Sequence, residues 1–105
     1  MEKIVDDIKE FIEKRNWRQF HTPDCLAKSI SIEAGELLEC FQWNNDYDKE
    51  HVLEEVADVL IYGLQMCIAL DVNPEEIIRS KMEKNAKKYP VEKAKGNSTK
   101  YSDFK

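Results

Sequence analysis

Apolar residues recur at helical spacing in four segments of this chain, which predicts four helices. The first segment, residues 2–14, presents an apolar stripe from Ile4 to Ile12 at i, i+3 and i+4 spacing. The second begins at Thr22-Pro23, a threonine suited to the N-cap followed by a proline suited to the first helical position. Its own stripe continues to Phe41.

The third segment, residues 49–70, is apolar in almost every direction around its axis, whereas its polar side chains share one narrow arc. At about 100° per residue, that arc holds Glu54, Glu55, Asp58, Tyr62 and Gln65. Unpaired charge on a mostly buried helix is costly, so these acids need partners. Because four short helices cannot bury an all-round apolar helix, the pattern also predicts a homo-oligomer.

The fourth segment starts at Asn73-Pro74, where asparagine suits the N-cap, and ends near residue 88 before Tyr89-Pro90. Residues 43–48, including Asn44 and Asn45, read as a polar loop. Residues 91–105 lack periodicity, which predicts a mostly mobile tail. Tyr101 and Phe104 are the tail residues that could pack against the helices. The sequence therefore predicts an all-α, oligomeric four-helix bundle over residues 1–90, with a C-terminal tail over residues 91–105.

Composition narrows the class of protein. The 105 residues suit one domain, and a net charge of −5 with a pI near 5.1 excludes a general binder of nucleic-acid polymers or anionic membranes. The three cysteines show no C-x-x-C pair, and no leader-like or membrane-spanning apolar run occurs. We therefore expect a cytoplasmic protein with free thiols that serve packing and with no membrane partner.

Two acidic pairs are the strongest chemical signal. Glu33 and Glu36 have i, i+3 spacing, as do Glu55 and Asp58, so each pair occupies one face of its helix. Two helices that turn such faces toward one space can hold hard divalent cations, which prefer oxygen ligands. Mg²⁺ is the expected ion, with Mn²⁺ as an alternative.

Further polar groups fit a nucleotide beside such a metal site. Lys81 and Lys88 share a helical face with Asn85, and lysines commonly neutralise phosphate charge. Trp17, His21 and Trp43 flank the predicted helices and can form a stacking or edge-reading pocket for a base.

These blocks, taken in order, resemble the all-α NTP pyrophosphohydrolase (MazG-like) superfamily, and within it the dCTP pyrophosphatases. The likeness extends from residues 17–23 through the two acidic pairs, residues 80–91 and the tail at residues 95–103. It implies Mg²⁺-dependent hydrolysis of a nucleoside triphosphate between the α- and β-phosphates, with dCTP as the expected substrate. It also implies a dimer or tetramer with sites between subunits.

Carried over by position, the resemblance implies a role for each candidate residue. Metal ligands and catalytic residues would be Glu33, Glu36, Glu55 and Asp58, with one of them or Glu54 deprotonating the attacking water. The base and sugar pocket would use Trp17, His21, Trp43, Tyr62 and Asn85. Lys81 and Lys88 would hold phosphates, with Lys100 and Tyr101 closing over them. The position of Lys88 often carries arginine in this family, so bidentate phosphate binding is lost there.

Three alternatives compete with this interpretation. A carboxylate-bridged di-iron bundle needs Glu-x-x-His, and neither His21 nor His51 has glutamate three residues earlier. A dUTP-cleaving or broad-range NTP pyrophosphohydrolase stays open, because base preference rests on a few contacts. A helical regulator that binds nucleotides without turnover also stays open. His51 is interpreted as a surface residue.

Overall fold

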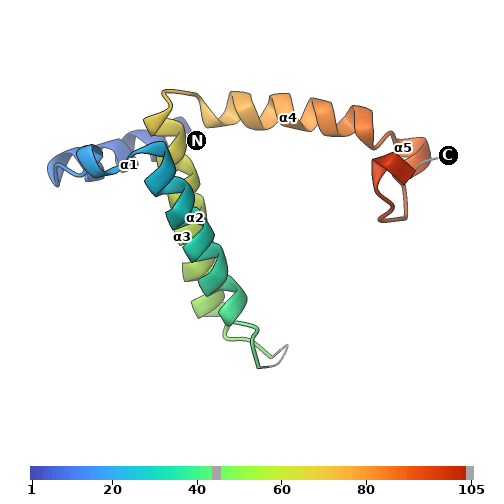
Figure 1. Ribbon diagram of the computed structural model, residues 1–105, viewed down its shortest axis with the longest axis horizontal. Coiled ribbons are helices and arrows are strands. Elements are labelled where there is room, and N and C mark those ends of the chain that lie inside the picture. Colours follow the sequence, from blue (N-terminus) through green and yellow to red (C-terminus); the bar gives the residue numbers. More distant parts are fainter. Residues whose placement is uncertain (44–45, 104–105) are drawn as a thin grey trace. The chain divides into compact units, whose positions relative to one another are not determined.

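The computed structural model describes residues 1–43 and 46–103. The predictions for Asn44, Asn45 and Phe104 therefore lie outside the described residues. Within the described part, every regular element is helical (Figure 1). In chain order these are α1 (Glu2–Lys14), η1 (Arg18–Phe20), α2 (Pro23–Glu39), α3 (Lys49–Ala69), α4 (Pro74–Lys88), α5 (Val91–Ala94) and η2 (Tyr101–Asp103).

The prediction of an all-α fold is confirmed, and α1 to α4 begin and end close to the predicted limits. Thr22 is the N-cap of α2 with Pro23 directly after it, although the threonine side chain makes no capping hydrogen bond. The predicted count of four helices is not matched, because the described residues also contain the short α5 and two 3₁₀ turns. These extra elements are too short to show periodicity in a sequence.

Local hydrogen bonds order the segment that was predicted to be a mostly mobile tail. The Asn97 side chain donates to the Lys93 carbonyl oxygen at 2.9 Å and accepts from the Thr99 amide at 3.0 Å. The Tyr89 and Tyr101 rings meet edge to face with centroids 5.9 Å apart. The structure therefore gives the segment two short helical elements, α5 and η2, whereas its mobility stays a prediction.

The chain divides into two compact units, Met1–Asn73 and Pro74–Lys105. The first contains α1, η1, α2 and α3, and the second contains α4, α5 and η2. The predicted division into a domain of residues 1–90 and a tail of residues 91–105 stays a prediction.

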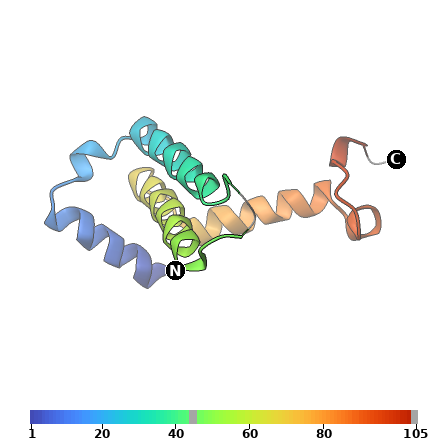
Figure 2. The ribbon, with the colours of Figure 1, turned by 90° about the horizontal axis from the view of Figure 1, so that it is seen from below.

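In the first unit α2 and α3 run side by side in opposite directions, and α1 packs against α3 (Figures 1 and 2). A small core joins α1 to α3 through Ile8, Ile12 and Ile68. Asp48 caps α3 by accepting a hydrogen bond from the Glu50 amide at 3.1 Å. The antiparallel pairing brings the middle of α2 to the middle of α3, where the two acidic pairs lie.

Much of the apolar surface of this unit stays exposed. Leu38 on α2 and Leu60 on α3 are 72% and 61% exposed, and Leu53 is also exposed.

Among the described residues, no helix is long and apolar enough to cross a membrane.

Candidate functional site

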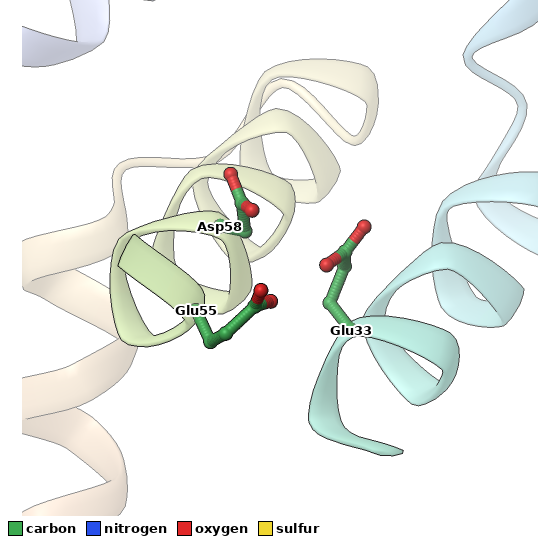
Figure 3. A group of neighbouring side chains, drawn as sticks. All are labelled: Glu33, Glu55 and Asp58. Atoms are coloured by element: carbon green, nitrogen blue, oxygen red, sulfur yellow. The ribbon is translucent and has the colours of Figure 1, made fainter. Parts of the chain in front are cut away.

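Three carboxylates from two helices converge between α2 and α3. Glu33 lies on α2, and Glu55 and Asp58 lie one turn apart on α3. One carboxylate oxygen from each of the three lies within 4.8 Å of the other two. Figure 3 shows the three side chains pointing into the same space. The acids predicted to face a common space therefore do so for three of the four positions.

The environment of Glu33 disfavours its negative charge. Oε2 of Glu33 and Oε2 of Glu55 are shielded from solvent and have no hydrogen-bond partner. A hydrogen bond with Glu36, desolvation, and the charges of Glu36, Asp58 and Glu55 raise the pKa of Glu33 to about 7. Shielded acceptors beside repelling charges are expected to bind a cation or a proton.

Glu36 occupies a different place from the other three acids. It is exposed on α2 and hydrogen-bonds to Glu33 one turn before it. It does not belong to the group of three whose oxygens converge within 4.8 Å. The interpretation of Glu36 as a metal ligand therefore stays a prediction.

The donor set fits a hard divalent cation. The three convergent ligands are all carboxylates, the group that Mg²⁺ and Mn²⁺ prefer. A cation in this space would offset the repulsion that raises the pKa of Glu33 and give the shielded oxygens a partner. The residues present therefore fit the divalent ion that the sequence predicts.

An open cleft of about 420 Å³ adjoins the acidic group and shares Glu55 with it. Its volume is within the range of about 300–1,000 Å³ that small-molecule sites occupy. The walls come from the end of α2, residues 46–48 and the start of α3, and include Glu36, Glu39 and His51. Because acids dominate this lining, a phosphate would be repelled unless it arrived with its counter-cation.

His51 contributes to this cleft, a role that the sequence analysis missed. Its Nε2 lies 3.3 Å from Oε1 of Glu55, and the His51 side chain is otherwise half exposed. The signal that could have revealed it is the i, i+4 spacing of His51 and Glu55 on a helix.

The predicted base-binding residues of the first unit differ in their surroundings. Trp17 meets Phe11 edge to face with ring centroids 5.8 Å apart, and His21 lines a cavity of about 100 Å³. Tyr62 is half-buried on α3, one turn after Asp58. Trp43 is 87% exposed beyond the end of α2. The shared role of these four residues in binding a base stays a prediction.

A left-handed residue sets the path from α1 to Trp17 and His21. Asn16 has φ of 53°, a conformation that asparagine tolerates better than most residues. Its carbonyl oxygen accepts a hydrogen bond from the Gln19 side chain at 2.9 Å. The chain thereby turns after α1 into η1, which leads to His21 and the start of α2.

The predicted phosphate-binding residues belong to the second unit. Lys81 and Asn85 are exposed on α4, and Nζ of Lys88 lies 4.8 Å from the centre of the Tyr101 ring. Their roles toward phosphate and base, and the closure by Lys100 and Tyr101, stay predictions.

The three cysteines are free, as the sequence predicted. Desolvation raises the pKa of the Cys40 thiol, which lines the cleft, and of the Cys67 thiol, which is buried in α3. Both thiols are therefore held in the protonated form, which is a poor nucleophile.

Residues 28–104 match the MazG-like family, and the chain belongs to it. The matched range includes all three convergent carboxylates, the whole of α3 and α2 from Lys28 onward. The resemblance inferred from the sequence is thus confirmed.

The chain is similar to pyrophosphatases in both sequence and structure. The dCTP pyrophosphatase 1 proteins of Mus musculus and Homo sapiens are 36% and 34% identical to the chain, over 98% of the chain and 69% of each relative. The crystal structure of a pyrophosphatase from Archaeoglobus fulgidus superposes with a TM-score of 0.76 and 48% identity. It covers 86% of this chain and 92% of that one.

Proposed function

We propose that this protein is a Mg²⁺-dependent nucleoside triphosphate pyrophosphohydrolase that converts dCTP to dCMP and pyrophosphate. The observation that carries the proposal is the convergence of Glu33, Glu55 and Asp58 with two shielded, unpartnered oxygens. That arrangement occurs in a MazG-like chain whose relatives include dCTP pyrophosphatases and a pyrophosphatase of known structure.

The acidic residues would hold the metal and organise proton transfer. Glu33, Glu55 and Asp58 would bind Mg²⁺, with Glu36 supporting Glu33 and available as a fourth ligand. The bound ion supplies charge neutralisation at the phosphates and a lowered pKa for water. Glu54 is exposed beside Glu55 and can accept the proton of the attacking water at its carboxylate.

The remaining predicted residues would position the nucleotide. Lys81 and Lys88 would bind the phosphates as point charges, and Tyr62 would lie against the sugar and disfavour a 2′-hydroxyl. Trp17 and Trp43 would stack on the base, while His21 and Asn85 would hydrogen-bond to its edge. An amide offers an acceptor and donors side by side, which matches the amino group and ring nitrogen of cytosine.

A homo-oligomer, dimeric or tetrameric, is part of this proposal. The exposed apolar residues Leu38, Leu53 and Leu60 on α2 and α3 support it, because exposed apolar surface on paired helices commonly marks an interface. A second subunit would also add walls to a site that one small chain leaves open.

The decisive test is a panel of dNTPs and NTPs assayed for pyrophosphate release with Mg²⁺, Mn²⁺, Ca²⁺ or EDTA. We expect turnover with Mg²⁺, less with Mn²⁺ and none with EDTA, and the highest kcat/KM for dCTP. A tenfold preference for dUTP or dATP would refute the dCTP assignment but keep the enzyme class. Nucleotide-induced stabilisation without any pyrophosphate release would instead identify a non-catalytic nucleotide regulator.

A further inference from the structure

Gln65 on α3 is a buried polar residue with an unsatisfied hydrogen-bond acceptor. Its side chain is 7% exposed, and its Oε1 is shielded from solvent without a partner. Burying such an acceptor has a free-energy cost unless a ligand or water donates to it. The first unit is small and its core is apolar, so this cost calls for a functional reason.

Gln65 lies between two cavities along α1. One has a volume of about 100 Å³, with Ile12 and Ile68 as its apolar lining and with Lys9, Glu13, Arg18 and His21 as its polar lining. The other, of about 200 Å³, is almost entirely apolar and includes Ile8, Phe11 and Ile61. Gln65 therefore lines both cavities with an unpaired acceptor, and the lining of the smaller one also holds the donor-only cations Lys9 and Arg18.

The position of Gln65 on α3 relates it to the acidic group. It follows Asp58 by seven residues, which places both side chains on nearly the same face of the helix. At 1.5 Å per residue, the two positions are roughly 10 Å apart along the axis. That separation suits a nucleotide whose phosphates lie at the acids and whose sugar extends along α3 toward Gln65.

The size of the smaller cavity selects the kind of base. A closed cavity of about 150 Å³ holds one benzene molecule, and this one is about 100 Å³ and open to the surface. One six-membered ring fits with its outer edge inside, whereas the fused rings of a purine need more depth. A pyrimidine also carries N–H donors and ring acceptors on that edge, which matches the acceptor at Gln65 and the donors at Arg18 and Lys9.

We propose that Gln65 is a specificity-determining residue, whose amide hydrogen-bonds to the edge of a pyrimidine base in the cavity between α1, η1 and α3. This inference rests on the proposed nucleotide pyrophosphohydrolase function and adds to it the residue and the cavity that exclude purines. His21, already expected to contact the base, borders the same cavity. Ile12 and Ile68 supply the apolar lining that the ring edge contacts in this cavity, and the acids remain free to bind the metal.

The test compares Gln65→Met with a matched control on the same helix. Methionine preserves the length of the side chain and removes the proposed hydrogen bond to the base. Because the variant no longer buries an unsatisfied acceptor, it should be at least as stable as wild-type protein. Cys67→Ala is the control, since Cys67 is buried to a similar extent, 8% exposed, and lines neither cavity. A second variant, Gln65→Asn, keeps the amide but withdraws it by one methylene.

For each protein, kcat and KM are measured with dCTP, dUTP and dATP at one Mg²⁺ concentration. We expect Gln65→Met to lower kcat/KM for the two pyrimidines by about 10- to 100-fold, chiefly through KM. Turnover of dATP should change little. Gln65→Asn should also lower kcat/KM for the two pyrimidines. An unchanged ratio of pyrimidine to purine kcat/KM in a folded Gln65→Met protein would overturn the proposal and leave only a water-filled cavity.

Binding of nucleoside monophosphates tests the role of Gln65 independently of hydrolysis. If wild-type protein hydrolyses no nucleotide, the proposed function fails. Calorimetric titration with dCMP and dAMP then still tests the cavity. We expect wild-type protein and Cys67→Ala to bind dCMP more tightly than dAMP, and Gln65→Met to lose that preference. Equal affinities for the two nucleotides in wild-type protein would refute the role of Gln65.

Discussion

Nε2 of His51 lies 3.3 Å from Oε1 of Glu55. His51 is one turn before Glu55 on α3, the helix that carries two of the three convergent carboxylates. The other oxygen of Glu55, Oε2, has no partner and is shielded from solvent. The imidazole therefore contacts one oxygen of this carboxylate, and the other oxygen stays without a partner. Groups that orient a metal ligand in this way commonly affect affinity by about 10- to 100-fold.

We predict from this geometry that His51→Ala raises the Mg²⁺ concentration needed for half-maximal activity by about tenfold. The effect on kcat at saturating Mg²⁺ should be small, because the carboxylates themselves remain. A Mg²⁺ titration of the initial rate measures both quantities, and Lys49→Ala, an exposed change at the start of the same helix, is the control. An unaltered Mg²⁺ requirement in His51→Ala would show that the contact between His51 and Glu55 is incidental to metal binding.

The sequence predicted the helices well because their periodicity is local information. α1 and α4 were expected at residues 2–14 and 74–88, and both are observed there. The 3₁₀ turns and α5 were missed, since three or four residues carry no period and depend on contacts such as the one between Tyr89 and Tyr101.

The candidate site was only partly predictable. The i, i+3 spacing placed Glu55 and Asp58 on one face, but the register of α2 against α3 decides which acid of α2 meets them. The structure brings Glu33 to them and leaves Glu36 exposed beside it. Gln65 was placed in the polar arc of α3, yet its lack of a partner depends on packing against α1, which a sequence pattern does not show.

The convergent carboxylates should matter for hydrolysis and not for folding. Asp58→Asn is expected to lower kcat/KM by roughly a hundredfold or more, because a metal contributes several kcal/mol of charge stabilisation to the transition state. Glu36→Gln should also impair hydrolysis if Glu36 completes the ligand set. Both variants should keep their helical circular dichroism, and Glu50→Gln is an exposed control on α3. Normal turnover by a folded Asp58→Asn protein would contradict the proposed metal site.

The metal-free protein should become less stable as the pH rises through the titration of Glu33. Its pKa is raised from 4.5 to about 7 in the folded protein, chiefly through Glu36 and desolvation. Between these values the folded state holds a proton that the unfolded state has lost, so the free energy of unfolding falls with increasing pH and levels off above about 7. Thermal melts in EDTA across this range measure the trend.

Glu33→Gln provides the control for that pH dependence. Because glutamine does not titrate, the fall in melting temperature between pH 4.5 and about 7 should be much reduced in this variant. Mg²⁺ should reverse the trend in wild-type protein, since the ion favours the ionised carboxylates. An equally steep dependence in Glu33→Gln would assign the effect to another group.

An interface on α3 should be sensitive to charge at Leu60, which is 61% exposed in the single chain. Leu60→Glu would change the stability of a monomer little, but it would place an unpaired charge in a subunit interface. We expect light scattering to show a dimer or tetramer for wild-type protein and a smaller species, with lower activity, for Leu60→Glu. Lys3→Glu changes an already polar, exposed position on α1 and is the control. A wild-type protein that is monomeric and fully active at micromolar concentration would refute the proposed assembly.

The Tyr101 ring contacts two residues near the end of α4. Nζ of Lys88 lies 4.8 Å from the ring centre, and the Tyr89 ring packs against it edge to face at 5.9 Å. An exposed cation–π contact contributes about 0.5–1 kcal/mol and an aromatic pair about 0.5–1.5 kcal/mol, which is enough to order a short segment. Tyr101→Ala should therefore increase amide hydrogen exchange across residues 91–103 and leave α2 and α3 unchanged. Tyr101→Phe keeps both ring contacts and should behave like wild-type protein. If exchange in residues 91–103 is the same in Tyr101→Ala and Tyr101→Phe, the asparagine-centred hydrogen bonds of this segment hold it without the ring.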